Sequence, residues 1–129
     1  MIELAHTDAE TAALWERFHA LVNMPSPDLR AWLGTAPTDP QAYRFDPDLD
    51  VVETGPRVLN LLEKRRTDLT ADDMVLMGEV TDAIAAWLAD RHEDDDRWRH
   101  SLMSLGHDPL KADSPDGEEA AAALRRGTR

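Results

Sequence analysis

The feature that most constrains the fold is a single helical period between Lys64 and Arg91. Thr70 is an expected N-cap, because its hydroxyl can accept from a backbone amide that has no partner inside the helix. Asp72 and Asp73 place negative charge at the positive end of the helix dipole. Apolar side chains then recur every three or four residues, as in a helix that buries one stripe: Met74, Met77, Val80 or Thr81, Ile84, Trp87 and Leu88. The stretch therefore predicts a central helix around which the other elements pack.

Two details of this helix lead to narrower expectations. Asp73 stands where a capping box usually has Glu or Gln, so the predicted box is imperfect. Gly78 costs about 1 kcal/mol relative to alanine in a helix interior. A close contact with another helix would explain a glycine at this position.

Shorter helical segments precede the central one. Thr7 begins a capping box ahead of an apolar period, which predicts a helix over about residues 8–23. Pro25 ends it, because the residue before a proline avoids the helical region. Ser26 as N-cap, followed by a proline at the first helical position, predicts a second helix. Gly34 is the expected C-cap of that helix.

The remaining elements are separated by a stretch of unusual composition. Residues 35–53 contain three prolines and four aspartates, which predicts a long loop. The sequence Thr54-Gly55-Pro56 predicts the start of a third helix, and this helix is expected to end in Lys64-Arg65-Arg66. The acidic run Asp94–Asp96 predicts the N-terminus of a further helix, and Gly106 is its expected cap.

These segments together predict an all-α fold, a small bundle of four to five short helices around a central helix with one long loop. Residues 1–111 are expected to form a single helical domain. Residues 112–129 are expected to be a mobile, charged C-terminal tail, because they carry too little apolar surface to fold alone. A transient helix over Glu118–Arg126 is the most structure that their sequence predicts.

Composition narrows the classes of function. The 14 basic and 26 acidic residues give a net charge of −12, which repels nucleic acid at long range but leaves room for a local basic face. The chain has no cysteine, so disulfides, thiolate metal sites and cysteine nucleophiles are excluded. No apolar run is long enough for a membrane span and the N-terminus lacks a secretion signal. A cytoplasmic protein without a membrane partner is expected.

One group of residues has the chemistry of a metal site. His100, His107 and Asp108, with His92 and Asp94–Asp96 nearby, could supply the three ligands that catalytic zinc takes. A metal-dependent hydrolase is therefore one alternative, although the spacing matches no metal motif. The competing interpretation is a buried turn, in which the imidazole and carboxylate bond backbone groups left open by the preceding helix end. No catalytic residue, cofactor or bound metal is predicted.

The basic residues offer a second candidate site. These residues could contact the phosphates of a nucleic acid, which positions a protein on it without selecting a sequence. They are Arg57, Lys64, Arg65, Arg66 and Lys111. The structural alternative for Lys64–Arg66 is a favourable interaction with a helix dipole. The four tryptophans stand at helix-stripe positions and are expected in the core rather than in a stacking platform for bases.

Three stretches, taken together, resemble one family. Leu14–His19 with Val22–Met24 resembles its first motif, Gly55–Arg65 with Asp68–Met77 its second, and Gly106–Lys111 its third and most specific. The family is catalogued as domain of unknown function 3140, and some of its members are labelled DNA-binding.

The leading hypothesis is a non-catalytic binding protein, with DNA as a candidate ligand that only the resemblance implies. It also singles out the turn Gly106-His107-Asp108-Pro109, whose role is unknown. An acidic protein-interaction module remains the second hypothesis, with residues 35–53 or the run Asp94–Asp96 as its contact surface.

Overall fold

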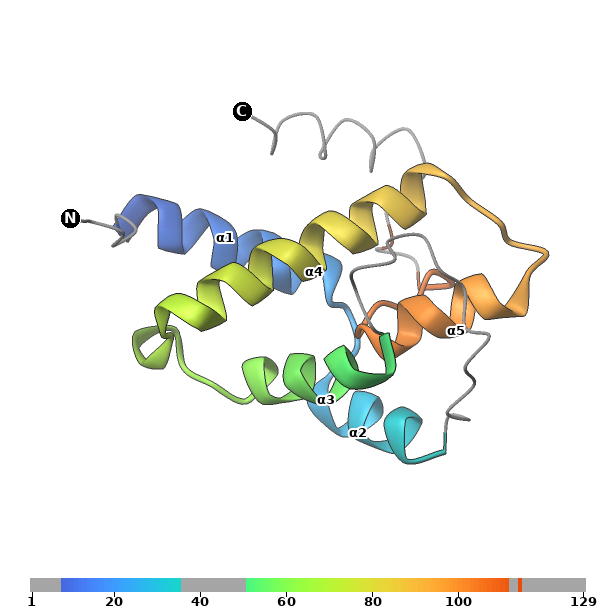
Figure 1. The fold of residues 1–129 in the computed structure, drawn as a ribbon, viewed down its shortest axis with the longest axis horizontal. Helices are drawn as coiled ribbons and strands as arrows, with labels where there is room; N and C mark the ends of the chain where they lie inside the picture. The colour runs from blue at the N-terminus through green and yellow to red at the C-terminus, as the bar shows by residue number, and fades with distance from the viewer. Residues whose placement is uncertain (1–7, 36–50, 112–113, 115–129) are drawn as a thin grey trace.

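The protein is seen in a computed structural model that describes residues 8–35, 51–111 and 114 (Figure 1). The predictions for Thr7, for the loop between 36 and 50 and for the tail after 114 lie outside these residues. The described part contains five α-helices, one 3₁₀ helix and no strand, which confirms the all-α fold. In chain order these are α1 (Asp8–Leu21), α2 (Ser26–Thr35), α3 (Val51–Leu62), η1 (Arg66–Asp68), α4 (Ala71–Ala89) and α5 (Asp96–Ser104).

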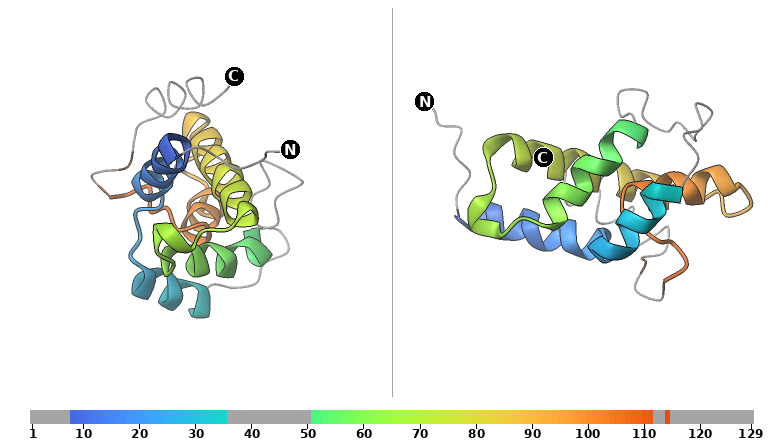
Figure 2. Two further views of the ribbon diagram at one scale, coloured as in Figure 1. Left: turned by 90° about the vertical axis from the view of Figure 1, so that its left-hand side faces the viewer. Right: turned by 90° about the horizontal axis from the view of Figure 1, so that it is seen from below.

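Helix α4 is the central helix, as its period predicts. It crosses the molecule with α1 beside it, while α5 runs back beneath it toward α2 and α3 (Figure 1). Figure 2 shows α1 and α4 on one side of the molecule and α2 and α3 on the other. Every residue of the predicted stripe is buried, and Leu76, Ala83 and Ala85 are buried with them. The buried surface of α4 is therefore wider than one stripe, because α1, α3 and α5 all pack against it.

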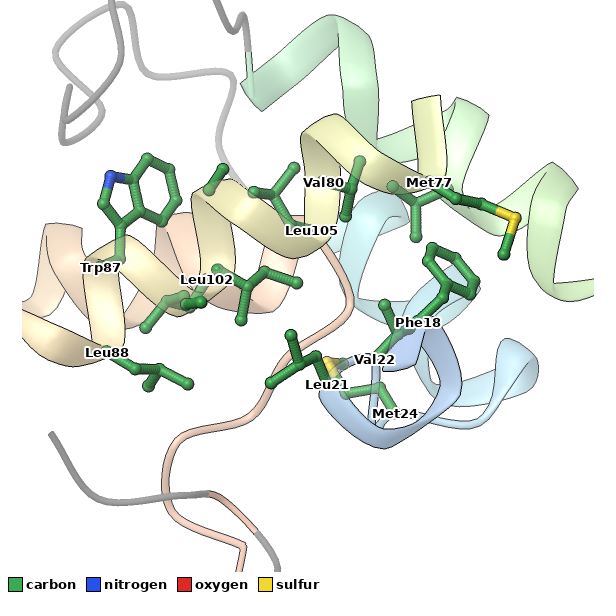
Figure 3. Packing of buried hydrophobic residues seen from close by; sticks show 14 of the residues in the cluster. Phe18, Leu21, Val22, Met24, Met77, Val80, Trp87, Leu88, Leu102 and Leu105 are labelled. Atoms are coloured by element: carbon green, nitrogen blue, oxygen red, sulfur yellow. The ribbon is translucent and has the colours of Figure 1, made fainter. Parts of the chain in front are cut away.

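A single hydrophobic core joins all five helices (Figure 3). Trp87 and Trp98 are fully buried in it, and the Trp98 indole N–H donates to the Trp87 carbonyl at 3.0 Å. Trp15 and Trp32 pack against it from partly buried positions. The tryptophans are thus core residues, as their spacing predicts. No helix in the described part of the chain has the length and apolar character needed to cross a membrane.

The N-terminus of α4 corrects one expectation. The Asp73 amide donates to the Thr70 hydroxyl at 3.1 Å, and the Thr70 amide donates to the Asp73 carboxylate at 2.9 Å. Both halves of the capping box are present. The prediction of an imperfect box was wrong, because the aspartate carboxylate still reaches back to the N-cap amide.

The glycines correct another expectation. A Cβ atom added at Gly78 would meet nothing within 4 Å, whereas one added at Gly55 would lie 2.8 Å from a Leu33 methyl and 2.8 Å from the Ser104 carbonyl oxygen. The prediction of a close helix contact at Gly78 is therefore wrong for the part of the chain that the structure describes. Gly55 makes the close approach instead, where α2, α3 and α5 meet.

Several predicted helix ends also shift. Helix α1 ends at Leu21, and α2 continues through Gly34 to Thr35. Helix α3 begins at Val51, so residues 51–53 belong to the helix rather than to the loop, and Pro56 lies inside it. Because α3 ends at Leu62, the basic triplet falls in the connection to α4. Helix α5, with Asp95 as N-cap, confirms the helix predicted after the acidic run.

Candidate functional site

The most specific motif of the sequence lies in a structure that we call the clasp. It consists of the corner Leu21–Met24 between α1 and α2 and the turn Gly106–Lys111 that follows α5. The two segments are distant in sequence and are joined by backbone and side-chain hydrogen bonds. The clasp therefore fixes the corner of one helix pair against the end of another helix.

Glycine is required where the clasp begins. Gly106 has φ +92°, its amide donates to the Met103 carbonyl at 2.9 Å, and the His107 amide donates to the Leu102 carbonyl at 2.9 Å. This pair of bonds is the Schellman motif that ends many helices. A Cβ atom at this position would lie 2.6 Å from a Val22 methyl. Backbone conformation and packing thus both exclude a side chain at Gly106.

Asn23 forms the centre of the clasp. Its side-chain oxygen accepts from the Asp108 amide at 2.7 Å, and its side-chain nitrogen donates to the Asp108 carbonyl at 3.1 Å. The primary amide thereby satisfies both backbone groups of one residue, as a neighbouring strand would. The Lys111 ammonium group donates to the Asn23 carbonyl at 2.8 Å, and the Met24 amide donates to the Gly106 carbonyl at 3.0 Å.

His107 is fully buried inside the clasp. Its Nδ1 contacts the carbonyl oxygen of Leu21, which can only accept, so Nδ1 carries a proton and donates. Its Nε2 lies 2.8 Å from the Ser114 hydroxyl, which can donate to it when the imidazole is neutral. Leu21 is the last residue of α1, and its carbonyl is one of those that a helix end leaves open.

The buried-turn interpretation of His107 and Asp108 therefore holds in part. The imidazole does bond a carbonyl at a helix end, but the helix is α1 rather than the preceding α5. The Asp108 carboxylate instead accepts from the Leu110 amide within its own turn, at 3.0 Å.

The structure does not assemble the metal site considered from sequence. The His100 ring lies against Trp32, with the ring centroids 5.1 Å apart, while His107 faces Leu21 and Ser114. His92 lies 3.3 Å from the Asp90 carboxylate. No group of three or more His, Cys, Asp or Glu side chains in the described ranges is placed to hold a metal ion.

The candidate basic residues occupy different parts of the molecule. Lys64 pairs with Asp73 at 2.6 Å, and Arg65 pairs with Asp68 at 2.9 Å while its side chain stays 82% exposed. Arg57 and Arg66 are exposed on α3 and η1, and Lys111 belongs to the clasp. Lys64–Arg66 are contiguous in the connection before α4, where Arg65 and Arg66 are exposed and Lys64 is half-buried.

Local contacts tune the ionisation of Asp73. Partial burial acts to raise the pKa of this carboxyl, but hydrogen bonds from the Lys64 ammonium group and from Thr70 outweigh it. The net effect lowers the pKa of Asp73 below its ordinary value of 3.8. Asp73 thus completes the cap of α4 and holds one of the candidate phosphate-binding cations in place.

The turn between α4 and α5 forms an open, polar hollow lined by Arg91, His92, Glu93, Asp94, Asp95 and Asp96. The Asp95 carboxylate accepts from the Arg97 amide at 2.9 Å and so caps α5. Hydrogen bonds from the Arg97 guanidinium lower the pKa of Asp95. The Arg91 guanidinium lies 5.3 Å from the centroid of the Trp98 ring, close enough for a cation–π contact. Asp95 and Arg91 therefore tie this turn to α5.

Sequence reasoning missed the roles of Asn23 and Lys111 in the clasp. The sequence marks Asn23 only as part of a family-like motif, and it groups Lys111 with the candidate phosphate contacts. No local pattern pairs a residue near position 23 with one near 108.

Fold and site together define a small all-α protein in which the turn Gly106–Lys111 joins the end of α5 to the corner between α1 and α2. Residues 17–103 match the family described as "Protein of unknown function (DUF3140)". The chain belongs to this family, as the resemblance of its first two motifs predicts. The match ends before Gly106–Lys111, so the third motif lies outside it. No curated protein and no solved structure matches the chain.

Proposed function

We propose that this chain is a non-catalytic binding protein in which the clasp is architectural. The observation that carries the proposal is the use of its polar groups within the chain. Asn23 bonds both backbone groups of Asp108, and both nitrogens of the buried His107 face oxygen atoms of the same chain. Side chains used in this way support a scaffold rather than a reaction centre.

The ligand that the geometry supports best is a basic protein segment bound at the turn Arg91–Asp96. Glu93, Asp94, Asp95 and Asp96 line the open hollow there. Glu93 pairs with Arg91 and Asp95 with Arg97, so the exposed side chains of Asp94 and Asp96 are the ones offered to a cationic partner. The net charge of −12 attracts cationic partners and speeds their association.

Titration with a lysine-rich peptide, followed by isothermal calorimetry at low salt, tests this proposal. We expect binding that weakens steeply as salt rises, and that falls several-fold in the double variant Asp94→Asn/Asp96→Asn. Asp95 is kept, because it caps α5. The matched control is Asp28→Asn/Asp72→Asn, which changes the same charge at exposed positions of α2 and α4. Equal losses in the two variants would show a response to net charge alone and would end the proposal.

DNA is the second candidate ligand. Its support is the label carried by some family members and the exposure of Arg65 and Arg66 in the connection before α4. Retardation of a DNA duplex at low salt, lost in the triple variant Lys64→Ala/Arg65→Ala/Arg66→Ala, is the expected result. A duplex that migrates unchanged at low salt with the unaltered protein would end this candidate.

A further inference from the structure

Among the residues that the structure describes, His107 is the only ionisable side chain that is fully buried. It joins three parts of the chain. Its Nδ1 donates to the Leu21 carbonyl at the end of α1, its Nε2 lies 2.8 Å from the Ser114 hydroxyl, and its amide donates to the Leu102 carbonyl of α5 at 2.9 Å. The turn Gly106–Lys111 cannot leave the corner of α1 and α2 unless this imidazole leaves its buried position.

The contacts of the His107 ring suit its neutral form. The Leu21 carbonyl can only accept, so Nδ1 carries the proton, and Nε2 can accept from the Ser114 hydroxyl. A second ring proton would turn Nε2 into a donor and would place a positive charge in a fully buried site. Burial disfavours the charged form of a side chain, whereas the same imidazolium in an open turn is solvated by water.

The charged side chains of the surrounding segments make contacts of their own. In the turn, the Asp108 carboxylate accepts from the Leu110 amide, and the Lys111 ammonium group donates to the Asn23 carbonyl. Lys111 therefore adds a like charge to the clasp in which His107 would be protonated. In the helices around it, Arg17 pairs with Asp82, His19 contacts the Trp15 carbonyl, His100 packs against Trp32, and Asp28 and Arg57 are exposed. Asp113 and Asp116 are close to Ser114 in sequence and lie outside the described residues.

We propose that the clasp opens in acid, when His107 takes up a second ring proton. The open turn binds this proton in water and the closed clasp does not, so the open form gains as pH falls. An exposed histidine is protonated below about pH 6.5, and the stabilisation of the closed clasp is complete above that range. Only the turn Gly106–Lys111 has to move, because it follows α5, the last helix that the structure describes. The architectural role of the clasp thereby becomes dependent on pH.

Amide hydrogen exchange in the full chain, followed by NMR, tests the opening directly. The Met24 amide donates to the Gly106 carbonyl and the Asp108 amide to the Asn23 side chain, so both are protected while the clasp is closed. We expect their protection, relative to an unstructured peptide at the same pH, to fall about tenfold between pH 7.5 and pH 5.5.

The Ile84 amide, in the buried middle of α4, serves as the reference for global unfolding. It should exchange more slowly than the Met24 and Asp108 amides at both pH values, because local opening costs less free energy than unfolding of the core. Equal protection at all three amides would mean that the clasp opens only when the whole chain unfolds, and would overturn the proposal.

His107→Gln and His92→Gln form a matched pair of variants. Glutamine can donate and accept but takes up no proton, so the clasp amides of His107→Gln should keep the same protection at both pH values. His92 is exposed in the turn after α4, and His92→Gln should keep the fall seen in the unaltered protein. A fall that survives His107→Gln, or one that disappears in His92→Gln, would overturn the proposal.

A second measurement needs no variant. The NMR shifts of the His107 ring report its protonation state in the unaltered protein. We expect a neutral ring with its proton on Nδ1 at the higher pH, and protonation at the lower pH together with the loss of protection at Met24. A ring that is protonated while the Met24 amide keeps its protection would show that the closed clasp holds the cation, and would overturn the proposal.

Discussion

The clasp and the connection between α3 and α4 are both polar links between helices. Their hydrogen bonds and ion pairs differ in how far apart along the sequence the paired residues lie. In the clasp, the bonds join residues far apart in sequence, such as Asn23 with Asp108. In the segment Glu63–Asp73, which runs from the end of α3 into the first turn of α4 and which we call the basic corner, they join near neighbours such as Arg65 with Asp68 and Thr70 with Asp73. The clasp is largely buried and the basic corner is largely exposed.

This difference determines what each region contributes to stability. A buried polar group that loses its partner retains the full cost of leaving water, whereas an exposed group recovers hydrogen bonds from solvent. The same kinds of side chain should therefore matter much more in the clasp than in the basic corner. Substitutions in the two regions test this comparison, and the expected loss of stability decreases from Gly106 in the clasp to Arg65 in the basic corner.

Gly106→Ala should have the largest effect. The left-handed conformation costs a non-glycine residue about 1–2 kcal/mol, and the contact of the new methyl with Val22 adds about 1–3 kcal/mol of overpacking. Urea unfolding should show stability reduced by about 2–5 kcal/mol. The control Gly34→Ala has open space at its Cβ position and should leave stability unchanged or slightly raised. Similar results for both glycines would contradict the packing assigned to the clasp.

Asn23→Ala should come next. It leaves both the amide and the carbonyl of Asp108 without their side-chain partner, which costs about 1–3 kcal/mol for part-buried groups. Thermal and urea unfolding measure the loss. Asn60→Ala, at an exposed position of α3, is the matched control and should change stability by less than about 0.5 kcal/mol. Equal losses of stability in Asn23→Ala and Asn60→Ala would contradict the contribution assigned to the clasp.

In the basic corner, Thr70→Ala should cost about 1 kcal/mol, since an N-cap is lost. Thr70→Ser keeps a hydroxyl that can accept from the Asp73 amide and should retain most of the stability. In the same urea assay, the loss of stability in Thr70→Ala should stay below that in Asn23→Ala. A larger loss in Thr70→Ala would contradict the difference between the two regions.

Acid titration adds a smaller and distinguishable effect at the same cap. Because the pKa of Asp73 is lowered in the folded state, its stabilising contribution is complete above its unfolded pKa of about 4. The contribution is then lost as pH falls through the lower folded pKa. Urea midpoints measured between neutral and acidic pH should show this loss in the unaltered protein. In Asp73→Asn that part of the pH dependence should be absent, and an unchanged profile would contradict the assigned cause.

Arg65→Ala should have the smallest effect. Its ion pair with Asp68 is exposed, and such pairs contribute about 0–1 kcal/mol. Urea unfolding should place the variant within about 0.5 kcal/mol of the unaltered protein, and added salt should shrink the difference further. A loss as large as that of Asn23→Ala would remove the distinction between the two regions.

Local features of the fold could be predicted from the sequence because they depend on near neighbours. The cap at Thr70, the buried stripe of α4 and the glycine end of α5 all follow from residues within one or two turns. The start of α3 could not be predicted in the same way. Thr54-Gly55-Pro56 resembles a helix start, but the helix begins upstream at Val51 and includes the proline.

Part of the candidate site could also be predicted. The sequence indicated that Gly106–Lys111 is a special turn and offered burial of His107 as one interpretation, which its complete burial bears out. It could not supply the partner of His107, because Leu21 lies at the far end of the chain. It also grouped Lys111 with the basic triplet, whereas the structure gives Lys111 a backbone partner in the clasp.

The all-α class, the central place of the longest helix and the family of the chain all follow from its sequence alone. Periodicity and capping depend on neighbouring residues, so the sequence is enough to predict them. The close contact at one glycine, and the polar residues that hold helices together, depend on the tertiary structure. Gly55 and Gly78 are the same residue type in helix interiors, but only at Gly55 do two other elements approach within 3 Å of the missing side chain. That distinction depends on where distant segments pack, and no local pattern records it.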